Sequence, residues 1–359
     1  MKFIRIVRFG FLFLLVFIFF FQPKIAFSYS DIPKDNLNYP VLIVNEKGGT
    51  GSGFFYHKKS MTYLITARHV LFDDTFIIRL PKKFDIPTNI QYKFNGKEAE
   101  IRDEKGGIIG KDFIITFRGV LSESERDELI NAAPMSEHDA IKQIYTKSQK
   151  MELRDSEITL LYYSINSLNN KEEAIIKINL SKCFKNGQVK YHPFQDVALI
   201  KISTDIENVA QERVNKVEYL DGITVIKQEG GFVIESDDQS ILLNDVIVGN
   251  EVFVLGYPTS ITGINPLLDI KLPLLRKGII AGKNEVLKSI ILDCPAFYGN
   301  SGGLVIEVDH ASCCSFKYKA IGLIAQFAPY ETGWFQNSGY SIVVPMDFVE
   351  DLIATKETK

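Results

Sequence analysis

Three short segments of the chain carry a histidine, an aspartate and a serine in surroundings typical of reactive residues. His69 ends an apolar run, Asp196 begins another, and Ser301 lies inside the glycine-rich segment 299–303. A serine hydroxyl is a poor nucleophile at neutral pH and needs an adjacent base. An imidazole supplies that base, and a carboxylate orients the ring and stabilises the imidazolium. This set of side chains predicts acyl-transfer chemistry with a serine nucleophile.

The glycines around Ser301 have a chemical use as well as a conformational one. Gly299 and Gly302 allow a tight bend that turns backbone N–H groups toward a developing oxyanion. A serine between glycines is also a common turn, so the motif alone is weak. Its value comes from its place after a histidine and an acid.

Around these residues the chain resembles the trypsin-like (chymotrypsin-fold) serine endopeptidases, and more narrowly their bacterial HtrA-type branch. The resemblance is carried by the order His69, Asp196, Ser301, with Thr-Ala-x-His-Val and Gly-Asn-Ser-Gly-Gly around the first and last. Further segments in the order expected for that branch are 254–258, 277–281, Asp293 and 340–345. Together these motifs cover roughly residues 40–350.

The resemblance implies a role for each residue. Ser301 would attack the scissile carbonyl, His69 would move the proton, and Asp196 would orient His69. The N–H groups of Gly299 and Ser301 would form the oxyanion hole. The implied substrate is a polypeptide, and no cofactor or metal is expected.

Four features depart from the family pattern. Arg68 replaces a small residue before the histidine, and we expect it to face substrate without touching the chemistry. His69 and Asp196 are unusually far apart in sequence. Asn300 stands where digestive members carry an aspartate that pairs with a new N-terminus, so we expect no such zymogen cleavage. Only fourteen residues follow Pro345, so we expect no PDZ module.

The residues around the substrate pocket suggest its preference. By the resemblance, Pro295 lies at the base of the pocket for the residue before the cut, and Ala325 and Gln326 line a neighbouring wall. An Arg or Lys side chain buried there would lack a carboxylate partner, which is unfavourable. A small or medium aliphatic residue is therefore expected before the cut. If the alignment shifts by a residue or two, Asp293 enters the pocket instead.

Two other functions use the same residues. The Gly-x-Ser-x-Gly pattern also occurs in α/β-hydrolase esterases, which need the order Ser, Asp or Glu, His. After Ser301 the chain has one histidine, His310, preceded directly by Asp309, and this spacing opposes an esterase. The second alternative is a catalytically silent binding protein on a protease scaffold, since fold does not guarantee function.

The elements that position these residues are mostly short strands rich in Val, Ile, Phe and Tyr. They predict an all-β protein, and the resemblance implies two antiparallel six-stranded β-barrels of the chymotrypsin fold. We expect the first barrel over 37–205, with strands that include 76–80, 90–94 and 98–102 and a helical insertion at about 121–150. The second barrel is expected over 206–359, with a C-terminal helix that contains Phe348 and Leu352.

The first 28 residues have the layout of a secretory signal. Lys2, Arg5 and Arg8 precede an apolar run over 9–21 and a small-residue cleavage region. The run is short for a bilayer-spanning helix, although an uncleaved membrane anchor remains the alternative. Removal of residues 1–28 takes away four positive charges and changes the net charge from −3 to −7. We therefore expect an exported, periplasmic or extracellular protein that does not bind nucleic acid.

The cysteines leave the disulfide state open. Cys183, Cys294, Cys313 and Cys314 allow three pairings if all are oxidised. A bridge between neighbours Cys313 and Cys314 would be strained. His310 lies near that pair, but no second ligand pair has the spacing of a zinc site. The oligomeric state, the physiological substrate and the use of the insertion are not specified by these patterns.

Overall fold

The computed structural model describes most of the chain after residue 38. The described residues are 39–73, 75–80, 86–87, 94–102, 108–118, 121–149, 151–165, 171–206, 216–227, 233–235, 239–265, 267–312, 315–331 and 335–355. The predicted signal at 1–28 lies outside them.

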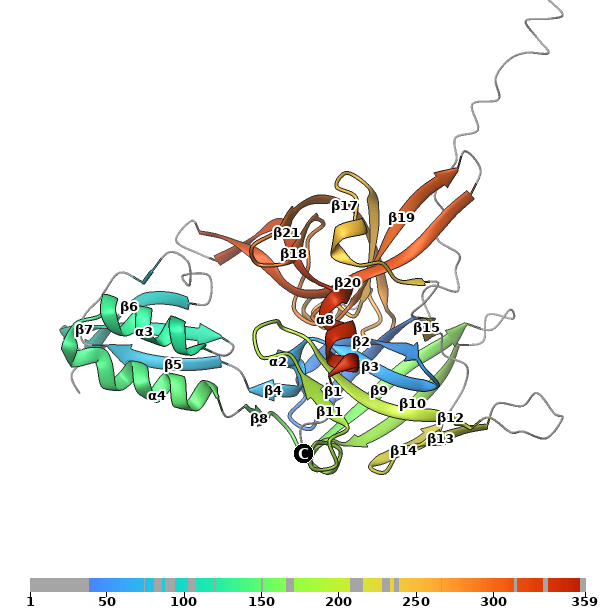
Figure 1. Ribbon diagram of the computed structural model, residues 1–359, viewed down its shortest axis with the longest axis horizontal. Helices are drawn as coiled ribbons and strands as arrows, with labels where there is room; N and C mark the ends of the chain where they lie inside the picture. The colour runs from blue at the N-terminus through green and yellow to red at the C-terminus, as the bar shows by residue number, and fades with distance from the viewer. Residues whose placement is uncertain are drawn as a thin grey trace, which may run out of the picture.

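The first half forms one curled sheet of ten strands (Figure 1). Its strands are β1 (Pro40–Asn45), β2 (Thr50–Lys58), β3 (Met61–Thr66), β9 (Glu157–Ile165), β10 (Lys171–Asn179), β11 (Val189–Tyr191), β12 (Ala198–Ile206), β13 (Lys216–Tyr219), β14 (Ile223–Lys227) and β15 (Val233–Glu235). The antiparallel path runs β11-β12-β3-β2-β1-β9-β10-β14. β13 pairs with β12, and β15 adds to β2 in parallel. The short helix α5 (Leu180–Lys185) follows β10.

The second half is a closed barrel of six antiparallel strands, in the order β16-β17-β18-β21-β20-β19. These are β16 (Glu251–Gly256), β17 (Leu274–Asn284), β18 (Ser289–Asp293), β19 (Leu304–Ser312), β20 (Ser315–Glu331) and β21 (Phe335–Pro345). Two short helical turns, η4 (Leu243–Asp245) and α7 (Thr259–Thr262), flank β16. The expected two-unit chymotrypsin-type β fold is confirmed. The first unit differs from the expectation because it is a ten-stranded curled sheet.

The predicted C-terminal helix is confirmed as α8 (Met346–Ala354), which lies against strands of both halves (Figure 1). Met346, Val349 and Leu352 are buried because helical spacing brings them to one face. They join an apolar core that runs from the first sheet into the barrel through Leu304 and Leu323. This continuous core holds the two halves in contact along the line where the candidate site lies.

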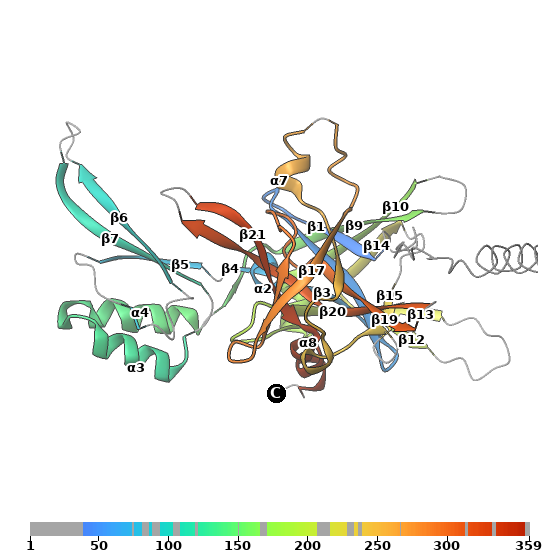
Figure 2. The ribbon, with the colours of Figure 1, turned by 90° about the horizontal axis from the view of Figure 1, so that it is seen from above.

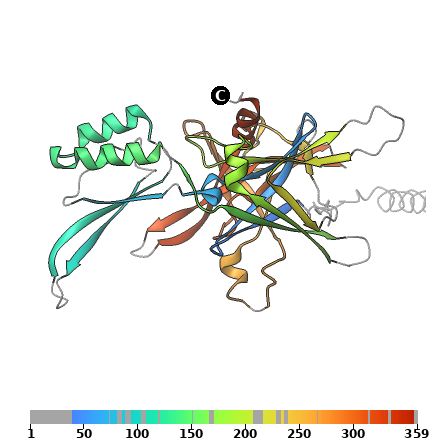
Figure 3. The same ribbon diagram turned by 90° about the horizontal axis from the view of Figure 1, so that it is seen from below.

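The long insertion is larger than expected and forms a separate lobe over residues 75–149. β5 (Thr75–Leu80), β7 (Ile108–Arg118) and β6 (Phe94–Arg102) form a three-stranded sheet, in that order. Against it lie α3 (Glu123–Ala132), the turn η3 (Met135–Glu137) and α4 (His138–Ser148), so the predicted helices are confirmed. Figures 2 and 3 show the lobe standing to one side of the body.

Local signals explain the two lobe helices, and tertiary contacts explain the strands. Ser122 and Glu125 form a reciprocal capping box at the start of α3. Leu129, Ile141 and Ile144 are buried with Phe117 of β7 in a small core of the lobe's own. The strands expected at 76–80 and 98–102 therefore belong to the lobe and not to the first barrel. Of the strand expected at 90–94, residues 90–93 lie outside the described residues.

A narrow stem joins the lobe to the body. The two-residue strands β4 (Phe72–Asp73) and β8 (Glu152–Leu153) pair antiparallel, with Phe72 opposite Leu153. The backbone N–H of Arg154 donates to the Leu71 carbonyl at 2.9 Å. The chain thus leaves the body three residues after His69 and re-enters it at an adjacent point.

The division expected at residue 206 stays a prediction. β13, β14 and β15 follow that residue and still pair with the first sheet, so this sheet extends to Glu235. Among the helices of the described residues, none has the length and apolar character needed to cross a membrane.

Candidate active site

His69 lies in a single helical turn, α2 (Arg68–Leu71), directly after β3. Val70 and Leu71 in the same turn are buried, and they fix its orientation. The Val70 side chain fills the space beside Gly51, where an added Cβ would come within 2.7 Å of it. The turn is therefore anchored by apolar packing, while 16% of the His69 side chain stays exposed.

Strand register brings Asp196 to His69. β12 pairs antiparallel with β3, with Ala198 opposite Thr66, so continued register places residue 196 opposite residue 68. The Asp196 carboxylate receives two hydrogen bonds from His69. The ring Nδ1 lies 2.7 Å from Oδ2, and the backbone N–H of His69 donates to Oδ1 at 3.0 Å. The two contacts hold the ring so that Nε2 remains available for proton transfer.

The turn that carries Ser301 is docked on the first sheet through its backbone. The backbone N–H of Ser52 in β2 donates to the Ser301 carbonyl at 2.8 Å. Gly302 N–H donates to the Ile324 carbonyl of β20 at 2.7 Å. These bonds place Ser301 where the sheet and the barrel meet.

Gly302 shows how closely the turn approaches the histidine strand. Its φ is +83°, and a Cβ there would lie 2.1 Å from the Ser52 carbonyl oxygen and 2.4 Å from Thr66 Oγ1. The same Cβ would lie 2.8 Å from the backbone nitrogen of Ala67, two residues before His69. Only glycine fits this position, because both the left-handed backbone and the space exclude a side chain.

Within residues 299–303, the backbone N–H groups of Gly299 and Ser301 have no acceptor in the described part of the chain. The N–H groups between and after them are bonded: Asn300 donates to Phe297 O at 2.9 Å and Gly303 to Asn300 O at 2.8 Å. The two free donors are the pair that the sequence predicts for the oxyanion hole.

The structure brings the three predicted residues to the junction of the first sheet and the barrel. His69 and Asp196 are in direct contact, and Ser301 is adjacent through its backbone. Among the described residues no hydrogen bond joins the Ser301 hydroxyl to the His69 ring. Such nucleophile–base bonds are often long without substrate and shorten when it binds.

Ser52 is a site residue that sequence reasoning missed. Its buried hydroxyl donates to the Gly299 carbonyl at 2.6 Å and accepts the Tyr257 N–H at 2.9 Å. The Ser52 carbonyl also accepts from Thr66 Oγ1 at 2.7 Å. A small polar residue between Gly51 and Gly53 was the available signal, but its partners are more than 200 residues away in sequence.

Arg68 does not face substrate, which corrects the expectation from sequence. Its side chain is buried, with 3% of the residue exposed, and its Nη1 donates to the carbonyl oxygens of His192, Pro193 and Gln195. An arginine excluded from water needs such acceptors, because an unpaired buried cation is strongly unfavourable. Arg68 therefore binds the loop that precedes Asp196.

The residues expected to line the substrate pocket precede and follow the Ser301 turn in the sequence. Ala325 is buried, Gln326 is exposed, and Pro295 is half-buried with its carbonyl 3.3 Å from Arg276 Nη1. Asp293 ends β18 and is exposed, opposite Tyr340 of β21. The roles of these residues in specificity stay predictions.

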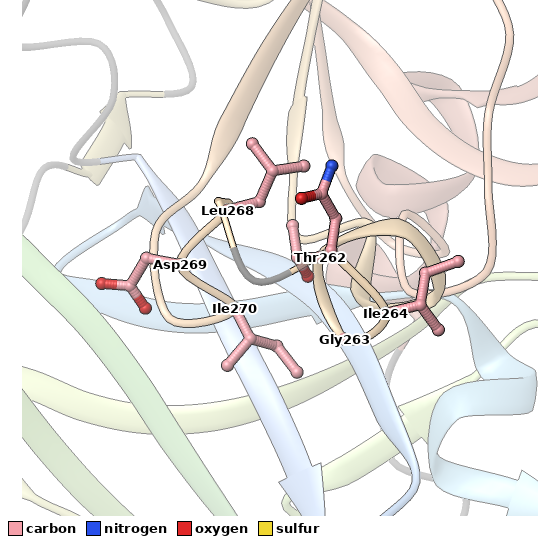
Figure 4. Close-up of a pocket in the computed structure, with 7 residues that line it drawn as sticks. Thr262, Gly263, Ile264, Leu268, Asp269 and Ile270 are labelled. Atoms are coloured by element: carbon pink, nitrogen blue, oxygen red, sulfur yellow. The ribbon is translucent and has the colours of Figure 1, made fainter.

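A pocket of about 440 Å³ lies elsewhere, in the segment between β16 and β17 (Figure 4). Its lining comes only from this segment and includes Thr262, Ile264, Leu268 and Ile270. None of the residues predicted for catalysis or specificity lines it. The start of this segment contacts the Ser301 turn: the Ser260 N–H donates to the Tyr298 carbonyl oxygen at 3.2 Å.

The two described cysteines are not placed for nucleophilic chemistry. Cys183 and Cys294 are buried free thiols. Burial raises the pKa of Cys183 to about 11, and burial also raises the pKa of Cys294. Thiols that resist ionisation are weak nucleophiles. Cys313 and Cys314 lie outside the described residues.

Comparison with known proteins yields only distant structural similarity. No protein-family model matches the sequence, and no curated protein sequence matches it. The chain is similar to Deg5, with 13% identity, a TM-score of 0.37 and coverage of 89% of this chain and 88% of that one. It is similar to the HtrA-type protease AlgW with tripeptide, with 12% identity, a TM-score of 0.37, and 89% and 62% coverage. It is also similar to the protease Anisep from Arthrobacter nicotinovorans, with 9% identity, a TM-score of 0.35, and 86% and 88% coverage. These similarities carry no conclusion about this chain, whose fold is described by its own strand pairing.

Proposed function

We propose that the protein is a serine endopeptidase, in which Ser301 is the nucleophile, His69 the general base and acid, and Asp196 the residue that orients His69. The observation that carries this proposal is the pairing of two features at one junction. His69 and Asp196 are hydrogen-bonded at 2.7 Å, and the adjacent turn presents two unbonded N–H groups beside Ser301. A base alone or a glycine turn alone would not support it.

The proposed reaction follows from these positions. Ser301 Oγ attacks the peptide carbonyl while His69 Nε2 takes its proton, and the oxyanion accepts hydrogen bonds from the N–H groups of Gly299 and Ser301. His69 then gives the proton to the leaving amine, which breaks the C–N bond and leaves an acyl-enzyme. A water molecule, deprotonated by His69, attacks the ester; the acyl–Oγ bond then breaks, His69 returns the proton to Ser301 Oγ, and the carboxylic acid is released.

The alternative of a silent binding protein is disfavoured by the same turn. A protein that only binds has no need to hold the Gly299 and Ser301 N–H groups without an acceptor among the described residues. Within the described residues the N–H groups of Asn300, Gly302 and Gly303 are bonded, so the two groups without acceptors do not reflect a loosely packed turn.

Hydrolysis of an unfolded protein substrate tests the proposal. Ser301→Ala and His69→Ala should each lower turnover on the order of 10⁴-fold or more, with the thermal transition unchanged. Asp196→Asn should lower it by roughly 10⁴-fold, because the imidazole then takes the wrong tautomer. Full activity in purified, folded Ser301→Ala protein would exclude Ser301 as the nucleophile.

The proposed preference is for a small or medium aliphatic residue before the cut. It is supported by the uncharged Pro295 and by Ala325 in the adjacent wall. Sequencing of the cut sites in a denatured protein mixture should show a majority after Val, Ala or Leu. A majority after Arg or Lys would point to Asp293 as the pocket residue.

Export of the protein is part of the proposal and rests on residues 1–28. A cleaved signal would release the catalytic body to the periplasm or the medium, and an uncleaved one would keep it at the membrane surface. N-terminal sequencing of protein recovered from a secreting host separates these cases, since a start near residue 29 indicates cleavage.

A further inference from the structure

The loop over residues 192–197 sets the position of Asp196. It connects β11 to β12, and β12 begins only at Ala198, so the strand ladder does not hold Asp196 directly. The loop closes on itself through two backbone bonds: His192 N–H donates to Val197 O and Val197 N–H to Gln195 O, both at 2.9 Å. Whatever fixes this loop also fixes the carboxylate that orients His69.

The Arg68 guanidinium is the contact that ties this loop to the histidine. Its Nη1 lies 2.7 Å from His192 O, 2.9 Å from Pro193 O and 3.1 Å from Gln195 O. Arg68 is the residue before His69 and lies in the same turn α2. One side chain therefore connects the segment of the base to three carbonyl groups of the loop that carries the acid.

His192 supports the same loop from within. Its Nδ1 accepts the N–H of Gln195 at 2.9 Å and that of Phe194 at 3.2 Å, which requires a neutral ring. Burial and the nearby Arg68 charge lower the pKa of His192, while Asp351 acts in the opposite direction. The ring also packs edge-on against Phe348 of α8, with centroids 4.9 Å apart.

We propose that Arg68 is a positioning residue that holds Asp196 against His69 by binding the carbonyl groups of the 192–195 loop. This inference rests on the proposed peptidase function for its kinetic part only. Without the guanidinium the three carbonyl groups lose their shared donor, and the Asp196 carboxylate is free to move away from His69 Nδ1. The ring would then lose the partner that stabilises its protonated form.

The test compares Arg68→Met with Arg68→Lys. Methionine keeps an unbranched apolar stem and removes every donor, whereas the lysine ammonium has three N–H donors on one nitrogen. In Arg68→Met, kcat should fall about 10–100-fold with KM changed much less, because substrate contacts are untouched. Arg68→Lys should retain most of the rate.

The pH profile separates positioning from a general loss of stability. Asp196 stabilises the imidazolium that forms on His69 during turnover, so its displacement should move the acid limb of kcat/KM in Arg68→Met. In Arg68→Lys the acid limb of kcat/KM should stay at its wild-type pH. Arg126→Met, which removes an arginine from the lobe, is the matched control and should change neither rate nor limb.

A spectroscopic readout makes the inference independent of activity. The proton on His69 Nδ1, hydrogen-bonded to Asp196, should give a downfield proton NMR resonance in the wild type and in Arg68→Lys, and should lose it in Arg68→Met. If the wild type shows the resonance but hydrolyses no peptide, the proposed function fails while the positioning role is still measured. If Arg68→Met does not fold, Arg68→Gln replaces it, with the resonance weakened and the limb shifted. A folded Met or Gln variant with an unchanged resonance and an unchanged acid limb would overturn the inference.

Discussion

The body and the lobe of this protein are built on different principles. In the body, long-range strand pairing and a continuous apolar core bring together residues that are 127 to 247 positions apart, such as His69 with Asp196 and Ser52 with Gly299. In the lobe, a three-stranded sheet and two helices enclose a small core of their own. The residues of the proposed site all come from the body, and the lobe is attached to it close to His69.

The stem explains how such an addition is tolerated. β4 and β8 form a two-stranded ladder, so the lobe begins and ends at neighbouring positions. Insertion between the two ends of a closed hairpin disturbs few contacts of the surrounding sheet. The lobe can therefore vary while the β3–β12 pairing and the 192–197 loop keep Asp196 beside His69.

Gly302→Ala should lower the unfolding free energy of the body more than the same substitution at another left-handed glycine. The left-handed backbone and the 2.1 Å approach to the Ser52 carbonyl should together destabilise the protein by about 2–5 kcal/mol. Peptidase activity should be lost with it. The matched control is Gly339→Ala, where φ is +89° but no atom lies within 4 Å of the new Cβ, and about 1–2 kcal/mol is expected. Urea unfolding measures both, and equal losses would contradict the proposed close docking of the turn.

Removal of the lobe should have a much smaller effect on the site. Residues 75–150 are replaced by Asn-Gly, which suits a two-residue hairpin between β4 and β8 and keeps the buried Met151. The variant should fold and react with a small fluorophosphonate within about threefold of the wild-type rate, because among the described residues the hydrogen bonds of the site all come from the body.

A point change in the lobe checks the same claim without a deletion. Leu129→Ala removes a buried side chain from the lobe core and should destabilise the lobe by about 2–5 kcal/mol. Hydrogen exchange should then increase in the lobe and stay unchanged in the body. Loss of fluorophosphonate reactivity in either lobe variant would show that the lobe is part of the catalytic unit.

The smallest expected effect concerns pH and the 192–195 loop. The pKa of His192 is lowered from 6.5, so the unfolded chain binds more protons at this residue than the folded one below that pH. The contribution of the neutral ring to stability is complete above about pH 6.5 and is lost as pH falls from there through the folded-state pKa.

His192→Asn should reduce this dependence, because the amide oxygen can accept the same two N–H groups and does not titrate. The loss of unfolding free energy between about pH 7.5 and about pH 5 should be smaller in the variant than in the wild type. His138→Asn, in the lobe, is the control for removal of one imidazole. An identical loss in wild type and His192→Asn would contradict the assigned role of His192.

Local patterns in the sequence were enough to predict some features and not others. The β-rich composition and the helical spacing of Phe348 and Leu352 are both local, and they led to the correct fold class and to the C-terminal helix. The meeting of His69 and Asp196 was accessible through motif order. The Ser52 bonds to Gly299 and Tyr257 were not, since nothing near Ser52 in sequence indicates which distant backbone it binds.

The placement of the lobe strands and the burial of Arg68 are two further features that local sequence patterns did not predict. The segments 76–80 and 98–102 have ordinary strand composition, and only their pairing partners assign them to the lobe. Arginine is usually found at the surface of proteins. Arg68 is buried because the loop that precedes β12 brings three carbonyl groups to its guanidinium. Register and burial are tertiary properties, so residue type alone could not give them.

Covalent labelling with a fluorophosphonate, located by peptide mapping, is the most direct test of the central claim that the body presents an activated serine beside His69. The full chain should take up one phosphonyl group, on Ser301, and His69→Ala should react far more slowly. Folded protein that stays unlabelled, or that carries the label on another residue, would contradict the account.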